Sequence, residues 1–168
     1  KLDNHRRLFT RLMASLKTVL NAMRRVGGDY IHEWGASNAL WKEPEVMKMI
    51  KTHDLRIIYF DGCSLELTSR EGGSIKKPWA FRTTIPEVVR RFSKFRCTCE
   101  KGSHDRCKGK DAELSAKCTW KMVEELHSCI KERQENSGAT DSQQHSWTTV
   151  VRQCQNILKA ISRGPEET

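Results

Sequence analysis

Residues 56–84 constrain the fold most, because they predict a buried strand that leads into a hairpin. The apolar run at 57–60 is typical of a buried strand, and a turn signal ends it. Residues 64–69 alternate between polar and apolar, which is the period of a half-buried strand. A glycine-containing loop at 71–74 and an extended segment at 75–84 complete the predicted antiparallel hairpin.

Helices are predicted both before and after this segment. Apolar residues recur every three or four positions over Asp3–Arg25, Glu43–His53 and Thr119–Arg133, and a capping box at 84–87 predicts a further helix. The short run Asp29–Glu33 predicts another strand. Helices and strands in alternation predict an α/β domain, in which a crossover joins parallel strands. We expect a small mixed sheet of about four strands flanked by helices.

The predicted organisation has three parts. Residues 1–133 form the α/β domain, with a cysteine- and histidine-rich loop at 96–118. Residues 134–144 are polar and predict a linker. Residues 145–163 predict an amphipathic helix that could dock on the domain or bind a partner. The start at Lys1 suggests a sequence excised from a longer protein.

The charge balance favours an anionic partner. The chain carries 30 lysines and arginines against 21 acids, a net charge of +9, so nucleic acid, either DNA or RNA, is the expected ligand. The alternative is that the charge serves solubility alone. Mean hydropathy is −0.67, and no apolar run approaches the ~20 residues of a membrane span, so no membrane partner is expected.

Cysteines and a histidine form the first candidate site. The spacing is Cys97-x-Cys99-x4-His104-x2-Cys107, with Cys118 further on. Three thiolates and one imidazole suit tetrahedral zinc. Because two cysteines one residue apart are a tight fit to one ion, Cys118 is an alternative to Cys97. The competing interpretation is a basic loop with free cysteines.

The other cysteines are expected to be structural. Cys63, Cys129 and Cys154 are interpreted as small buried hydrophobes. The seven cysteines are odd in number and clustered, which favours thiols in a reducing compartment over disulfides. The predicted location is therefore intracellular, nuclear or cytoplasmic, and not secreted.

Basic side chains and a tryptophan form the second candidate site, the basic rim. Lysines and arginines would contact phosphates, and the tryptophan would stack on a base. The competing interpretation places the tryptophan in the core and the charges in solvent. The candidate contacts are Lys76, Lys77, Trp79, Arg82, Arg90, Arg91, Lys94, Lys108 and Lys110, and the same span holds Arg96, Lys101 and Arg106.

Acids at predicted strand ends form the third candidate site. Glu33, beside His32, and Asp61 each end a predicted strand. Ligands of open α/β sheets bind at the carboxyl ends of parallel strands, so these acids could perform acid/base chemistry. The alternative is that they cap the turns that follow.

The order of these motifs resembles a known family. Glu33-Trp34, Asp61-Gly62-Cys63 and Lys76-Lys77-Pro78-Trp79 precede the cysteine- and histidine-rich loop. This arrangement is similar to the C-terminal half of methyltransferase-like domains in phage cytosine methyltransferases and in retroelement polyproteins. The resemblance extends over about Met23 to Ile130.

The resemblance implies a Rossmann-methyltransferase-like half in which Glu33 is catalytic and contacts the target cytosine. The family's cofactor loop and Pro-Cys nucleophile are absent from this chain, and Gly35 replaces the proline after the glutamate pair. S-adenosylmethionine would therefore lack most of its pocket.

We expect a non-catalytic nucleic-acid-binding domain of a mobile-element protein. One alternative is a DNA methyltransferase fragment that needs a missing cofactor-binding half. The other is a protein-interaction or oligomerisation module that uses the helix predicted at 145–163. A sheet with an unpaired edge would also allow a homodimer.

Overall fold

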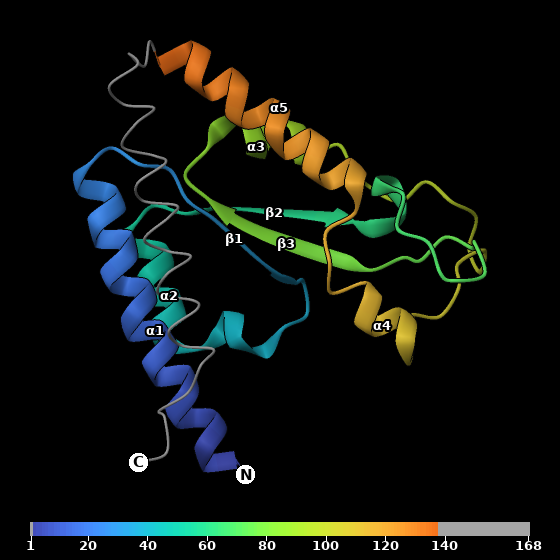
Figure 1. Ribbon diagram of the computed structural model, residues 1–168, viewed down its shortest axis with the longest axis horizontal. Coiled ribbons are helices and arrows are strands. Elements are labelled where there is room, and N and C mark those ends of the chain that lie inside the picture. The colour runs from blue at the N-terminus through green and yellow to red at the C-terminus, as the bar shows by residue number, and fades with distance from the viewer. Residues whose placement is uncertain (1, 138–168) are drawn as a thin grey trace, which may run out of the picture. The chain divides into compact units, whose positions relative to one another are not determined.

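A three-stranded antiparallel sheet lies at the centre of the computed structural model, which describes residues 2–137 (Figure 1). Helices pack against each face of the sheet. In chain order the elements are α1 (Leu2–Arg25), β1 (Ile31–Gly35), the 3₁₀ helix η1 (Ala39–Lys42), α2 (Pro44–Thr52), β2 (Arg56–Asp61), the 3₁₀ helix η2 (Gly62–Leu65), β3 (Pro78–Thr83), α3 (Pro86–Phe92), α4 (Lys110–Leu114) and α5 (Trp120–Ser137).

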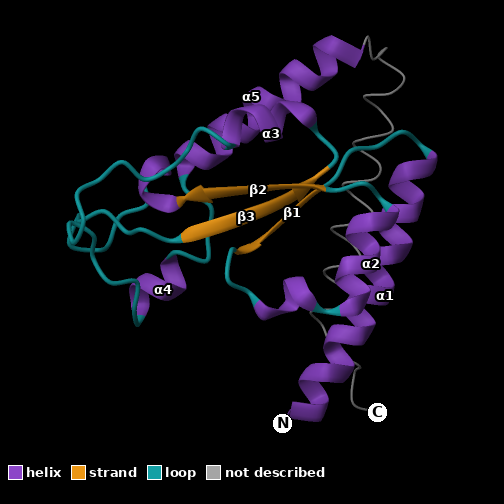
Figure 2. Cartoon of the chain, turned by 180° about the vertical axis from the view of Figure 1, so that it is seen from behind, coloured by secondary structure: helices purple, strands orange, loops and turns teal. Residues whose placement is uncertain are grey.

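The strand order is β1-β3-β2, and both strand pairs are antiparallel (Figure 2). The prediction of a mixed sheet of four strands with a parallel crossover is therefore wrong for residues 2–137. β1 and β2 do run in the same direction, but β3 lies between them. The reason is that β3 is apolar on both faces: Trp79, Ala80 and Phe81 are all buried, so this strand takes the centre.

The predicted hairpin also differs. Residues 62–65 form η2 rather than a strand, and a single antiparallel bridge, Thr68 to Ser74, joins the two arms. Leu65 and Leu67 are nevertheless buried. Burial of these leucines is achieved by a 3₁₀ turn followed by Glu66 in the left-handed conformation (φ 61°). The alternation of polarity therefore indicated the buried side chains but not the backbone conformation.

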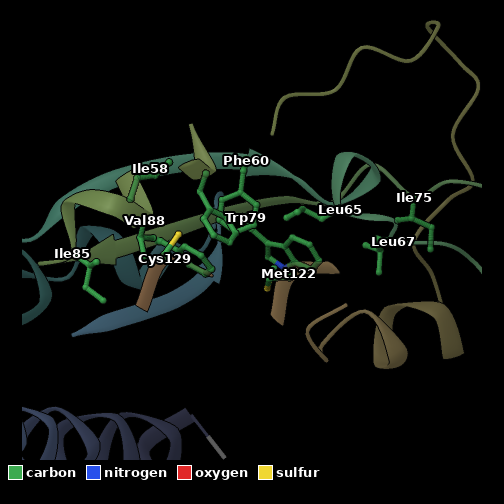
Figure 3. Packing of buried hydrophobic residues seen from close by; sticks show 12 residues of the cluster. Ile58, Phe60, Leu65, Leu67, Ile75, Trp79, Ile85, Val88, Met122 and Cys129 are labelled. Carbon is green, nitrogen blue, oxygen red and sulfur yellow. The ribbon is translucent and has the colours of Figure 1, made fainter. Parts of the chain in front are cut away.

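The two faces of the sheet carry different cores. On one face, Phe60 and Phe81 pack with Phe92 of α3 and with Met122 and Cys129 of α5. Figure 3 shows Phe60, Met122 and Cys129 within this cluster. The second cluster joins the opposite face to α1, η1 and α2. Its buried members are Met13, Leu20, Trp41, Val46, Met49, Leu55 and Ala80. The aromatic packing of the first cluster is close, with ring centroids of Phe60 and Phe81 4.5 Å apart.

The helix ends differ from prediction in two places. α3 begins at Pro86 without a side-chain cap, and Thr84 Oγ1 instead accepts a hydrogen bond from the Tyr30 N–H at 2.9 Å. The predicted capping box is therefore wrong. α5 continues to Ser137, so the first residues of the predicted linker are helical. The helix predicted at 145–163 lies outside the described residues.

None of the described helices has the length and apolar character needed to cross a bilayer.

Candidate metal centre

Three thiols and an imidazole meet at the end of β2. Cys63 comes from η2, and Cys97, Cys99 and His104 come from the loop that joins α3 to α4, which lies beyond the arrowhead of β2 in Figure 2. The four ligand atoms lie within 4.8 Å of one another. Cys97 Sγ is 3.4 Å from His104 Nε2. This cluster could hold a metal ion.

Asp61, the last residue of β2, fixes the first part of the loop. Its backbone N–H donates to Phe95 O at 2.9 Å, and its Oδ2 accepts from the Cys97 N–H at 3.0 Å. These two bonds place Cys97 beside Cys63, which follows Asp61 by two residues. The strand end thus leads directly into one thiol of the cluster and positions a second.

Asp105 fixes the histidine end of the loop. Its N–H donates to Ser74 O at 2.8 Å, and its Oδ2 accepts from Ser69 Oγ at 2.6 Å. A Cβ on Gly73 would lie 2.1 Å from Asp105 Oδ2, so this approach requires glycine. The neighbouring His104 is therefore held by polar contacts of the backbone and of Asp105.

The thiols differ in acidity. Burial, together with Cys97 and Cys99, raises the pKa of Cys63 to about 12. Desolvation opposes ionisation of Cys97, but the Cys99 N–H, the neighbouring thiols and the Lys76 charge lower the pKa of Cys97 below its ordinary value. Cys97 therefore ionises more readily than Cys63, and the thiolate is the form that binds metals.

The structure separates the predicted zinc ligands. It brings Cys97, Cys99 and His104 together, but Cys107 Sγ lies 3.2 Å from Ser115 Oγ and is outside the cluster. The predicted substitute, Cys118, is exposed and also lies outside it. The interpretation of Cys63 as a buried hydrophobe is wrong, because its thiol is half-buried and belongs to the cluster. Cys63 is too distant in sequence for a spacing motif, and the available signals were its position after a turn and its place in the Asp61-Gly62-Cys63 segment.

The remaining two cysteines are outside the cluster. Cys129 is fully buried in the apolar core, as predicted. Cys154 lies outside the described residues.

Two members of the predicted basic rim are buried. Trp79 is 2% exposed and packs against Phe60, so its ring is not available to a base. Arg82 is 4% exposed, and its guanidinium lies 4.1 Å from the ring centroid of Trp41. Both belong to the central strand β3, whose side chains are covered on both faces.

Three other rim residues already have protein partners. Arg90 pairs with Glu132, and Arg91 pairs with Glu125 and Glu132. Lys77 Nζ donates to Ser115 O at 2.6 Å. These side chains bind neighbouring elements rather than facing solvent alone.

The remaining basic side chains of the rim are exposed, and we call them the loop cations. None forms an ion pair with a carboxylate of residues 2–137. They are Lys76, Lys94, Arg96, Lys101, Arg106, Lys108 and Lys110.

The predicted acid/base residues do not form one site. Glu33 lies in the middle of β1, opposite Phe81, rather than at a strand end. Burial raises the pKa of Glu33, and Lys77 partly offsets this effect. His32 points to the other face of the sheet because consecutive strand residues alternate. Asp61 does end β2, but its carboxylate accepts a hydrogen bond from the Cys97 N–H of the loop.

His32 is held as a neutral ring. It lies 4.2 Å from Trp34 and 5.3 Å from Trp41 between ring centroids. Burial and the Arg82 charge lower the pKa of His32 to about 4. Its Nδ1 is buried with no hydrogen-bond partner among the described residues. His32 therefore belongs to the aromatic packing of the sheet.

Comparison of the chain with protein-family models, with curated proteins and with solved structures finds no match. The chemistry of the cysteine–histidine cluster and of the loop cations is therefore the basis for a functional proposal.

Proposed function

We propose that this chain is a non-catalytic nucleic-acid-binding domain whose basic loop is held in place by a structural zinc ion. The observation that carries the proposal is the convergence of Cys63, Cys97, Cys99 and His104, with their ligand atoms within 4.8 Å. The origin in a mobile-element protein rests on the motif resemblance and is part of the same proposal.

Zinc is the metal that suits this donor set best. Three sulfurs and one imidazole nitrogen form one of the usual structural zinc sites, with bonds of about 2.3 Å to sulfur and about 2.0 Å to nitrogen. In a tetrahedron of those bonds, sulfur and nitrogen lie about 3.5 Å apart, close to the 3.4 Å between Cys97 Sγ and His104 Nε2. Four protein ligands leave no open position, which favours a structural role over a catalytic one.

The loop cations supply the reason for nucleic acid. Residues 94–110 contain six lysines and arginines but only two acids, and the loop cations are exposed. Phosphate contacts of this type are independent of base sequence, and they weaken as salt rises. Zinc would fix the loop and thereby hold several cations on one surface.

The zinc part is tested by metal content. Protein purified in reducing buffer is expected to carry one zinc per chain by native mass spectrometry. Cys99→Ser removes an exposed ligand and should lose the metal, while Cys118→Ser, also exposed but outside the cluster, should keep it. Absence of zinc from the wild type, or retention of zinc by Cys99→Ser, would contradict the site.

The nucleic-acid part is tested by fluorescence anisotropy with short DNA and RNA at several salt concentrations. Reversing Lys101 and Arg106 to glutamate should weaken binding at least about tenfold and reduce the salt slope by about two. The matched control reverses Lys48 and Lys51, which are exposed on α2. Equal losses of affinity in both double variants would indicate a nonspecific effect of net charge and would rule out the loop as the binding surface.

A further inference from the structure

The outer edge of β2 is open over a short stretch. β2 pairs with β3 on one side only. Ile57 and Tyr59, in its middle, are 48% and 44% exposed. Apart from the sheet itself, neither residue has a backbone hydrogen bond to the described part of the chain. Proteins usually protect such an edge with charged residues, proline or a bulge, and residues 57–60 contain no charged residue or proline.

Hydrogen bonds at the end of β2 fix which backbone groups face outward. Gly62 N–H donates to Lys77 O, on the β3 side, at 2.8 Å, whereas Asp61 N–H donates to Phe95 O, on the other side. Backbone groups of successive strand residues point to opposite edges. Ile57 and Tyr59 therefore direct their N–H and C=O groups outward, as Asp61 does. The same two residues expose both their backbone and their side chains.

This pattern is self-complementary. In an antiparallel pair, directly opposed residues point to the same face of the sheet. A two-fold axis through Ile58 would place Ile57 opposite Tyr59 of a second copy, and Tyr59 opposite its Ile57. Each outward N–H would then meet an outward C=O, and each exposed aliphatic chain would pack against an aromatic ring.

We propose that β2 pairs with β2 of a second copy of this chain, in the register that places Ile57 opposite Tyr59. Only a short stretch of β2 can pair in this way, because the backbone is already hydrogen-bonded at one end and turns at the other. Phe95 O already occupies Asp61 N–H at one end, and at the other end the chain turns at Asp54, which has φ 49°. The dimer is therefore expected to be reversible and dependent on concentration.

β1, the other edge strand, suits this role less. Glu33 lies in its middle, and the five residues of β1 are all partly buried. Two copies of β1 paired through this edge would bring two Glu33 carboxyl groups together. β2 has no such repulsion at its centre.

Sedimentation equilibrium of the whole chain, without nucleic acid, tests the proposal. The wild type is expected to form a monomer–dimer equilibrium. The double variant Ile57→Lys/Tyr59→Lys should weaken it at least about tenfold by placing like charges opposite each other. Met47→Lys is the matched control, since Met47 is 54% exposed on α2 and should leave the equilibrium unchanged.

A charge-swapped variant tests the register. In Ile57→Glu/Tyr59→Lys, each new carboxylate faces a new ammonium of the second copy, so association should recover relative to the double lysine variant. A monomeric wild type, a dimer that tolerates both lysines, or failure of the charge swap to restore association would overturn the proposal. These outcomes are independent of zinc content and of nucleic-acid binding.

Discussion

No side chain from Ser93 to Leu114 is buried, whereas five of the six residues of β3 are buried. The sheet and its helices are ordered by apolar packing around Phe60, Phe81 and Phe92. In the loop between α3 and α4, the partly buried Phe95 packs against Phe92, and the rest of the loop depends on polar contacts such as those of Asp61 and Asp105. A loop with so little apolar burial needs another source of order, and a metal at the cysteine–histidine cluster would supply it.

The largest expected effect comes from a substitution in the apolar core of the sheet. Phe81→Ala should lower the free energy of unfolding by about 3–5 kcal/mol, because Phe81 is buried beside Phe60 and Phe92. Urea unfolding followed by circular dichroism measures this change. Trp120→Ala is the control, since Trp120 is 76% exposed and its loss should cost less than about 0.5 kcal/mol. Equal losses would show that the packing around Phe81 is not the main source of stability.

Lowering the pH is expected to destabilise the sheet, because His32 resists protonation in the folded chain. Its pKa is about 4 in the folded chain, lowered by burial and Arg82, against about 6.5 when unfolded. The unfolded chain therefore gains a proton first. Stability should fall as the pH decreases from about 6.5 to about 4, by up to about 3 kcal/mol, and this contribution should then level off.

Urea unfolding at several pH values, with His32→Gln as the comparison, isolates this contribution. The variant lacks the titrating ring but keeps all other ionisable groups, so its stability should fall less than that of the wild type between pH 6.5 and pH 4. Parallel pH curves for the two proteins would show that His32 is not responsible.

The smallest effect is expected for a substitution in the loop between α3 and α4. Asp105→Ala removes the acceptor of Ser69 Oγ and should cost about 1–2 kcal/mol. Amide hydrogen exchange should accelerate around residues 97–105 and remain unchanged in β3. Glu113→Ala, at an exposed acid of α4, is the control. If β3 amides accelerate as much as the loop amides, the two regions are not separately stabilised.

The sequence was informative where apolar residues recur regularly. The helix predicted over Asp3–Arg25 is found as α1, and the apolar run at 57–60 lies in β2. Strand pairing could not be predicted because it depends on which strand needs cover on both faces. β3 was interpreted as one arm of a hairpin, although its three consecutive buried residues, Trp79 to Phe81, were visible as an apolar run.

The site was less predictable than the fold. Cys97, Cys99 and His104 lie close in sequence, so a local pattern could group them. Cys63 joins them only because the hydrogen bonds of Asp61 bring the loop to the end of β2. Charge density likewise grouped Arg82 with Lys76, although one is buried beneath Tyr59 and Trp41 and the other is exposed. Composition does not distinguish these environments.

Asp61 has a further consequence, because it terminates β2 and also holds the start of the loop through both its N–H and its carboxylate. An event that displaces this residue must act on the strand and the loop together. If the cluster binds a metal, a ligand that prefers one arrangement of the strand end would be thermodynamically coupled to that metal's affinity, and the coupling would be reciprocal. Asp61 is therefore the residue through which the sheet edge and the cysteine–histidine cluster would influence each other.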